Sequence, residues 1–132
     1  MSQENVELLR AGYDAINRGD LDAALELTDP EVVFEPLRAP VSGAYYGLGG
    51  IREFFTDTAE SFDRFRVEAP DMRDLGDGRV LAIGTMHARV REGGVETEVV
   101  SAGIATFHNG KLLRWKDYGD RAKALEAAGL RE

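Results

Sequence analysis

Residues 111–118 read Lys-Leu-Leu-Arg-Trp-Lys-Asp-Tyr and directly follow the pair Asn109-Gly110. An Asn-Gly pair between two strand-like runs predicts a tight β-hairpin, so residues 111–118 are expected to form its second strand. Side chains two apart share a face, so Leu113, Trp115 and Asp117 are expected to point together toward the core. Burying an unpaired carboxylate is costly, and such a group is either hydrogen-bonded or raised in pKa. Asp117 therefore invites a functional interpretation.

Strand-like patterns also precede this hairpin. Runs over residues 64–75, 79–92 and 95–107 are separated by the glycine-containing turns at 76–78 and 93–94. Together with residues 111–118 they predict a four-stranded antiparallel meander.

The first half of the chain has helical periodicity. Val6 begins an apolar stripe with three- and four-residue spacing, and Asp20 is the expected N-cap of a second helix that ends at Asp29-Pro30. A short strand at 31–35 and a loop at 36–46 follow, and then a third helix begins among the glycines at 47–50. A capped helix is expected over residues 120–130. We predict one α+β domain over residues 1–132, with helices packed on one face of a curved sheet.

Composition excludes several classes of protein. The 132 residues are 43% hydrophobic and 30% charged, as in a globular domain, and the formal net charge of −8 argues against nucleic-acid and membrane-surface partners. The chain has no cysteine, so disulfides and thiolate chemistry are excluded. The spacing of His87 and His108 does not suggest a metal site. No apolar run is long enough for a signal peptide or membrane span, so a cytoplasmic location is expected.

Small residues gather on one face of two neighbouring predicted strands. Ser101, Gly103 and Ala105 share a face of one strand, and Gly84, Met86 and Ala88 share a face of the next. Glycine inside a strand often marks the close approach of a ligand or of another backbone. In one arrangement these residues form the bottom of an open cavity beneath the helices. In the other, side chains from the helices fill the same space, as in a close-packed core. The sequence leaves both arrangements open.

Three motifs carry a resemblance to a known family. They are residues 13–22 (Tyr-Asp-Ala-Ile-Asn-Arg-Gly-Asp-Leu-Asp), residues 47–55 around Ile-Arg-Glu-Phe-Phe, and residues 115–130. With the order of elements, these motifs resemble the SnoaL-like branch of the NTF2-like superfamily, which includes polyketide cyclases, ketosteroid isomerases and limonene epoxide hydrolases. The resemblance covers nearly the whole chain. It implies a cone-shaped α+β barrel with an apolar pocket and, commonly, a homodimer formed through the outer face of the sheet.

The resemblance also suggests site residues. Glu35, before Pro36, falls where the steroid isomerases carry a carboxylate base, and Trp115 and Asp117 fall where the epoxide hydrolases carry a tryptophan and a water-activating aspartate. Two carboxylates in one apolar pocket would act as a general acid/base pair.

The match to each reaction is incomplete. Gly12 and Gly103 stand where the isomerases build their oxyanion hole, and Met86 and Ala88 stand near the epoxide hydrolases' arginine and second aspartate. Many SnoaL-like chains have a histidine and a tryptophan at Gly103 and Ala105. A steroid isomerase in the strict sense is therefore not expected.

We expect a cofactor-independent acid/base enzyme (isomerase, cyclase or hydrolase) that acts on a hydrophobic cyclic molecule. Asp117 and Glu35 are the expected catalytic residues, which would accept and donate protons. The alternatives are a non-catalytic ligand-binding module and a dimerising scaffold with a filled core. No cofactor and no metal are expected. The expected ligand-binding residues are Tyr13, Phe54, Met86, Ser101, Gly103 and Trp115.

Overall fold

The computed structural model describes residues 2–37, 39 and 43–130. The helices in this part of the chain are α1 (Ser2–Asn17), α2 (Leu21–Glu26), α4 (Gly47–Ser61) and α5 (Arg121–Ala127). The strands are β1 (Thr28–Glu35), β2 (Tyr45–Tyr46), β3 (Phe62–Gly76), β4 (Arg79–Val90), β5 (Glu96–His108) and β6 (Lys111–Asp117).

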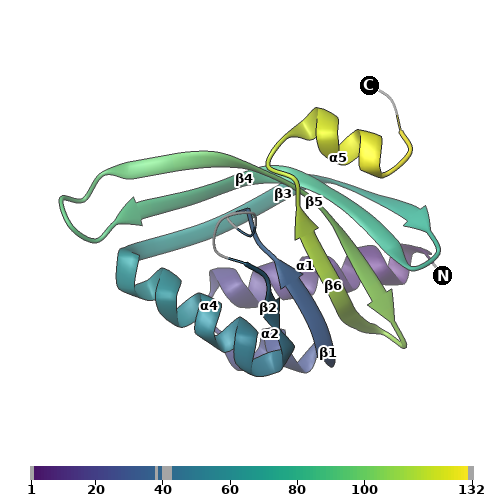
Figure 1. Ribbon diagram of the computed structural model, residues 1–132, viewed down its shortest axis with the longest axis horizontal. Helices are drawn as coiled ribbons and strands as arrows, with labels where there is room; N and C mark the ends of the chain where they lie inside the picture. Colours follow the sequence, from purple (N-terminus) through teal and green to yellow (C-terminus); the bar gives the residue numbers. More distant parts are fainter. Residues whose placement is uncertain (1, 38, 40–42, 131–132) are drawn as a thin grey trace.

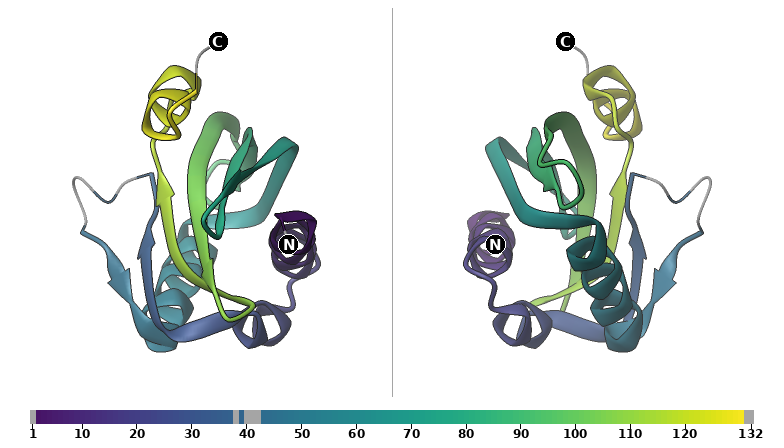
Figure 2. Two further views of the ribbon diagram at one scale, coloured as in Figure 1. Left: turned by 90° about the vertical axis from the view of Figure 1, so that its right-hand side faces the viewer. Right: turned by 90° about the vertical axis from the view of Figure 1, so that its left-hand side faces the viewer.

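The strands form one curved sheet in the order β2-β1-β6-β5-β4-β3, and the sheet does not close into a barrel (Figure 2). Strands β3 to β6 pair antiparallel in sequence order, which confirms the predicted meander. Strand β1 joins this meander by pairing in parallel with β6, and β2 pairs antiparallel with β1. The α+β class with N-terminal helices packed on a curved sheet is confirmed.

Alternation along the strands gives the sheet two buried faces. On the inner face, Val80, Ala82 and Trp115 pack in one cluster with Val6 and Leu9 of α1. On the outer face, a separate cluster joins strand residues to α5, and its buried members are Leu81, Ile83, Ala102, Ile104, Ala124 and Leu125. Figure 1 shows α5 on the opposite side of the sheet from α1, α2 and α4.

The second helix and the following loop differ from the sequence prediction. Helix α2 ends at Glu26, and Asp29-Pro30 lies inside β1. Proline is tolerated there because the register between β1 and β6 is irregular from Thr28 to Val33, so no regular ladder bond is lost. The predicted loop also contains the short strand β2. Its pairing with β1 depends on a tertiary contact that local sequence does not specify.

The hairpin between β5 and β6 forms at Asn109-Gly110, where both residues have positive φ, 52° and 77°. The register then shifts, because Phe107 pairs with Leu112 whereas Thr106 pairs with Arg114. Leu113 is thus the extra residue of a β-bulge. Leu112, not Leu113, consequently packs with the inner cluster that contains Trp115. The predicted inner position of Leu113 is therefore wrong, because the bulge moves Leu113 out of the inner cluster. Trp115 and Asp117 lie on the inner face, as predicted.

Candidate functional site

The inner face of the sheet and the helices beneath it enclose a cavity of about 530 Å³. Most of its lining is apolar, and an aromatic cluster centred on Phe54 forms one wall. The ring of Phe54 contacts those of Phe34, Tyr45 and Phe55 edge to face, with centroids 5.0, 5.4 and 5.0 Å away. Phe65 extends the cluster from β3. A hydrophobic ring compound of moderate size therefore fits the volume and the chemistry of this cavity.

Asp117 lines the cavity and is buried, with only 9% of its surface exposed. One oxygen, Oδ1, accepts hydrogen bonds from the backbone N–H groups of Gly119 (2.8 Å) and Ala102 (3.3 Å). The other, Oδ2, accepts from the Ser101 hydroxyl at 2.9 Å. Burial raises the pKa of Asp117 above its ordinary value, although these three hydrogen bonds oppose the shift. A carboxylate with a raised pKa is better matched to proton transfer near neutral pH than an exposed one.

Tyr13 lines the same cavity from α1, and its ring meets that of Trp115 edge to face at 6.4 Å. Burial and, secondly, the negative charge of Asp117 raise the pKa of Tyr13 well above its usual range. The phenol therefore stays protonated at physiological pH. Its hydroxyl makes no hydrogen bond to any residue that the structure describes, so it remains available to a ligand.

Glu35 does not share the cavity with Asp117, contrary to the expected carboxylate pair. Its Oε2 accepts hydrogen bonds from Arg114 Nη2 (2.6 Å) and Nε (3.0 Å). Side chains alternate along β1, so Phe34 lines the cavity and Glu35 points to the opposite face of the sheet. The structure thus supplies one buried carboxylate where two were predicted.

The other predicted ligand-binding residues divide into two groups. Phe54, Met86, Ser101 and Trp115 line the cavity together with Tyr13. Gly103 does not, because the indole ring of Trp115 lies over it; a Cβ added there would meet Trp115 Cζ2 and Cη2 at 2.6 Å. The small residue at this position therefore makes room for tryptophan and not for a ligand.

Several lining residues were not predicted as ligand-binding. Phe34 and Phe55 complete the aromatic wall, and Leu37 reaches the cavity from the segment after β1. Phe55 belongs to the apolar stripe of its helix, so periodicity marked it as buried without distinguishing a cavity wall from a packed core. Leu37 had no periodic signal, since it lies outside regular structure.

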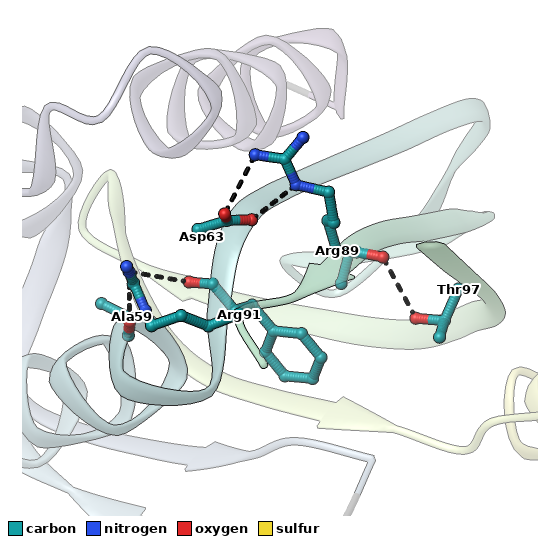
Figure 3. A network of polar contacts seen from close by, with 7 residues as sticks. Ala59, Asp63, Arg89, Arg91 and Thr97 are labelled. Atoms are coloured by element: carbon teal, nitrogen blue, oxygen red, sulfur yellow. Dashed lines mark hydrogen bonds and ion pairs between the residues drawn. The ribbon is translucent and has the colours of Figure 1, made fainter. Parts of the chain in front are cut away.

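The rim of the cavity consists of its exposed lining residues Asp57, Ser61, Thr97 and Val99. Arg91 fixes the end of α4 beside this rim, because its guanidinium donates hydrogen bonds to the carbonyl oxygen of Ala59 at 2.8 and 3.2 Å (Figure 3). Figure 3 also shows the ion pair between Arg89 and Asp63 and the Thr97 hydroxyl that donates to the Ala88 carbonyl. These contacts join α4, β3 and β5 to the end of β4.

Two further classes of site have no support in the part of the chain described. Within it, no group of three or more His, Cys, Asp or Glu side chains is arranged to hold a metal ion. Among the helices of the same residues, none is both long and apolar enough to cross a membrane. His87 lies on the outer side of β4, where it contacts Glu68 at 2.7 Å.

The curved sheet over N-terminal helices, with an apolar cavity between them, defines the NTF2-like class of folds. The sequence profile of the SnoaL-like domain family matches residues 9–115, and the chain belongs to that family. No curated protein sequence matches the chain.

Solved structures with the same fold include three that cover nearly the whole chain. An NTF2-like protein of unknown function from Burkholderia pseudomallei has a TM-score of 0.78 at 20% identity, with 93% of this chain and 95% of that chain covered. TerC, co-crystallised with polyporic acid, has a TM-score of 0.77 at 23% identity, with coverage of 96% and 98%. A protein from Catenulispora acidiphila with a ketosteroid isomerase-like fold, in complex with trimethylamine, has a TM-score of 0.75 at 16% identity, with coverage of 95% and 94%. At these identities the likeness establishes the fold.

Proposed function

We propose that this protein binds a hydrophobic cyclic small molecule in the cavity and carries out cofactor-independent acid/base chemistry on it, as an isomerase, cyclase or hydrolase. The observation that carries the proposal is that one apolar cavity is lined both by the buried Asp117 carboxylate and by Tyr13, whose hydroxyl makes no hydrogen bond to a described residue. TerC, which shares the fold, was co-crystallised with polyporic acid, and this agrees with a small-molecule role here.

In this proposal Asp117 is the general base. Its Oδ2 receives a proton from the substrate or from a water molecule, and Ser101 holds this oxygen in place at 2.9 Å. Tyr13 donates its O–H to the oxygen on which negative charge develops. A donor aimed at that charge in a low-dielectric cavity stabilises the transition state. Glu35 has no role in this mechanism because it faces away from the cavity.

Turnover tests the proposal. Cyclic compounds that raise the melting temperature of the protein are incubated with it, and the mixture is analysed by liquid chromatography and mass spectrometry. We expect product formation that falls by about 10²–10⁴-fold in Asp117→Asn, as is typical for loss of a general base. Glu35→Gln is the matched carboxylate control and should leave the rate unchanged. Undiminished turnover in Asp117→Asn would contradict the assignment.

The second candidate is a non-catalytic ligand-binding module. It is favoured by the three hydrogen bonds to Asp117, which give the carboxylate a structural role: those from Ser101 and Ala102 tie the end of β6 to β5, and that from Gly119 holds the turn after β6. This candidate predicts that every bound ligand is recovered chemically unaltered. The detection of a product would exclude it.

We also propose that the chain forms a homodimer through the outer face of the sheet. Val100 supports this proposal: it lies on that face beside Thr85 and is 47% exposed. The carboxylates Glu96 and Glu98, on the same face of β5, would lie at the edge of such an interface.

A further inference from the structure

We propose that the ligand of this cavity carries a protonated amine, whose ammonium group lies between the Asp117 carboxylate and the Tyr13 hydroxyl. This inference rests on the proposed function only in using the same cavity. It names the charge class of the ligand, which neither the fold nor the family specifies.

Among the described residues that line the cavity, every side chain that carries a formal charge at neutral pH is a carboxylate. These carboxylates are Asp117 and the rim residue Asp57, and among the described lining residues there is no lysine, arginine or histidine. A ligand carboxylate or phosphate would therefore be buried near Asp117 without a countercharge, which is strongly unfavourable. A cation would instead pair with Asp117. The formal net charge of −8 also favours the approach of cations over anions.

The hydrogen-bonding capacity left at Asp117 and Tyr13 fits an ammonium group. Oδ2 of Asp117 accepts a hydrogen bond from Ser101, and a carboxylate oxygen has room for a second. The Tyr13 oxygen is likewise free to accept within the part of the chain described. An ammonium group has up to three donors and no acceptor, so it satisfies both oxygens together.

Aromatic side chains complete the surroundings of a cation. Tyr13 and Trp115 are in edge-to-face contact and line the same cavity as Asp117, and the faces of aromatic rings attract cations within about 6 Å. The wall around Phe54 then accommodates the apolar body of the ligand. Carboxylate, phenol and indole groups at one place and phenyl groups at another match an amine joined to a hydrophobic ring.

The test uses three ligands that share one ring and differ in charge: naphthylethylamine, naphthylethanol and naphthylacetate. Dissociation constants are measured at neutral pH by calorimetry and by the fluorescence of Trp115, the single tryptophan of the chain. We expect the amine to bind at least about tenfold more tightly than the alcohol, as for a hydrogen bond between charged groups, and the acetate to bind most weakly. Phenylethylamine, phenylethanol and phenylacetate repeat the comparison with a smaller ring.

Two variants test whether the preference for the amine over the alcohol depends on the Asp117 carboxylate. Asp117→Asn keeps the size of the side chain and an acceptor for the Gly119 N–H, and it should make the amine and the alcohol bind equally. Asp57→Asn, a matched change at the rim, should retain the preference. If circular dichroism shows that Asp117→Asn is unfolded, Asp117→Ser takes its place in the comparison.

The inference is overturned if neither amine binds more tightly than its alcohol, or if the preference survives in the Asp117 variant. Such a result leaves the acid/base proposal intact, because turnover of a neutral ring compound does not require an amine. Conversely, a confirmed amine preference with unchanged turnover in Asp117→Asn would overturn the proposed function and not this inference.

Discussion

Asp117 is subject to two opposing effects inside the cavity. Burial favours its protonated form, and hydrogen bonds from Ser101, Ala102 and Gly119 favour the ionised form. Burial is the larger effect, so the folded protein holds the Asp117 proton more tightly than the unfolded chain does. The same imbalance that suits the group for proton transfer also makes ionisation of Asp117 a destabilising event for the fold.

This imbalance predicts how Asp117→Asn changes stability with pH. Between the ordinary value of 3.8 and the raised pKa in the folded state, the folded protein binds more protons than the unfolded chain, so the Asp117 contribution to stability falls as pH rises. Asparagine does not ionise and has no such dependence. The stability of Asp117→Asn relative to the parent should therefore increase from pH 4 to neutrality, as measured by urea unfolding. A stability difference that does not change with pH would contradict the raised pKa.

Gly103 is the second residue whose role can be tested directly. Gly103→Ala places a methyl group against the Trp115 indole and the Lys116 carbonyl, and we expect a loss of about 1–3 kcal/mol in unfolding free energy, as for overpacked cores. The fluorescence of Trp115 should also change in Gly103→Ala, because the added methyl group lies against its indole ring. Gly49→Ala is the matched control, because its Cβ would meet nothing within 4 Å and alanine is favoured in a helix by roughly 0.5–1 kcal/mol. Equal stability of the two variants would refute the proposed close packing.

At the scale of elements, the hairpin of β5 and β6 sets the orientation of the site. Its turn fixes where β6 begins, and the bulge at Leu113 decides which alternate side chains face inward. Without the bulge, the pairing that places Leu112 against Phe107 would turn Trp115 and Asp117 to the outer face. A single extra residue thus determines that the carboxylate enters the cavity.

The bulge predicts unequal effects for two adjacent leucines. Leu112→Ala removes side-chain atoms from the inner cluster, and since Leu112 is half-buried we expect a loss of about 1–2 kcal/mol. Leu113→Ala should cost clearly less, because Leu113 belongs to none of the buried clusters of the described chain. Urea unfolding of the two variants measures the difference. The reverse order would indicate a hairpin without the bulge.

At the scale of the whole molecule, the sheet has different partners on its two faces. The inner face borders the helices and the cavity, and α5 covers only part of the outer face. The remaining outer surface, which includes Val100, is the area proposed for the dimer.

The dimer proposal predicts a mass of twice 14.5 kDa in sedimentation equilibrium at micromolar concentration. Val100→Glu should convert the dimer to a monomer, because it adds a carboxylate to a face that already carries Glu96 and Glu98, and like charges repel each other in an interface. Val99→Glu is the matched control: Val99 is 44% exposed but lines the cavity, so the dimer should persist. A monomeric parent protein, or equal behaviour of the two variants, would contradict the proposed interface.

The sequence alone determined most of the elements, and it determined that Trp115 and Asp117 share one face of their strand. Helical and strand periodicities, the Asp20 cap and the Asn109-Gly110 turn are local signals, since each arises from backbone preferences within a few residues. They predicted the antiparallel meander and the inward-facing Trp115 and Asp117.

The tertiary structure decided what these elements enclose. Sequence could not tell that Glu35 turns away to Arg114, that Trp115 fills the space over Gly103, or that the Tyr13 hydroxyl lies in the field of Asp117. Each depends on a contact between segments far apart in the chain, such as the parallel pairing of β1 with β6. Burial and charge proximity, which give Asp117 and Tyr13 their chemistry, exist only after those segments have packed together.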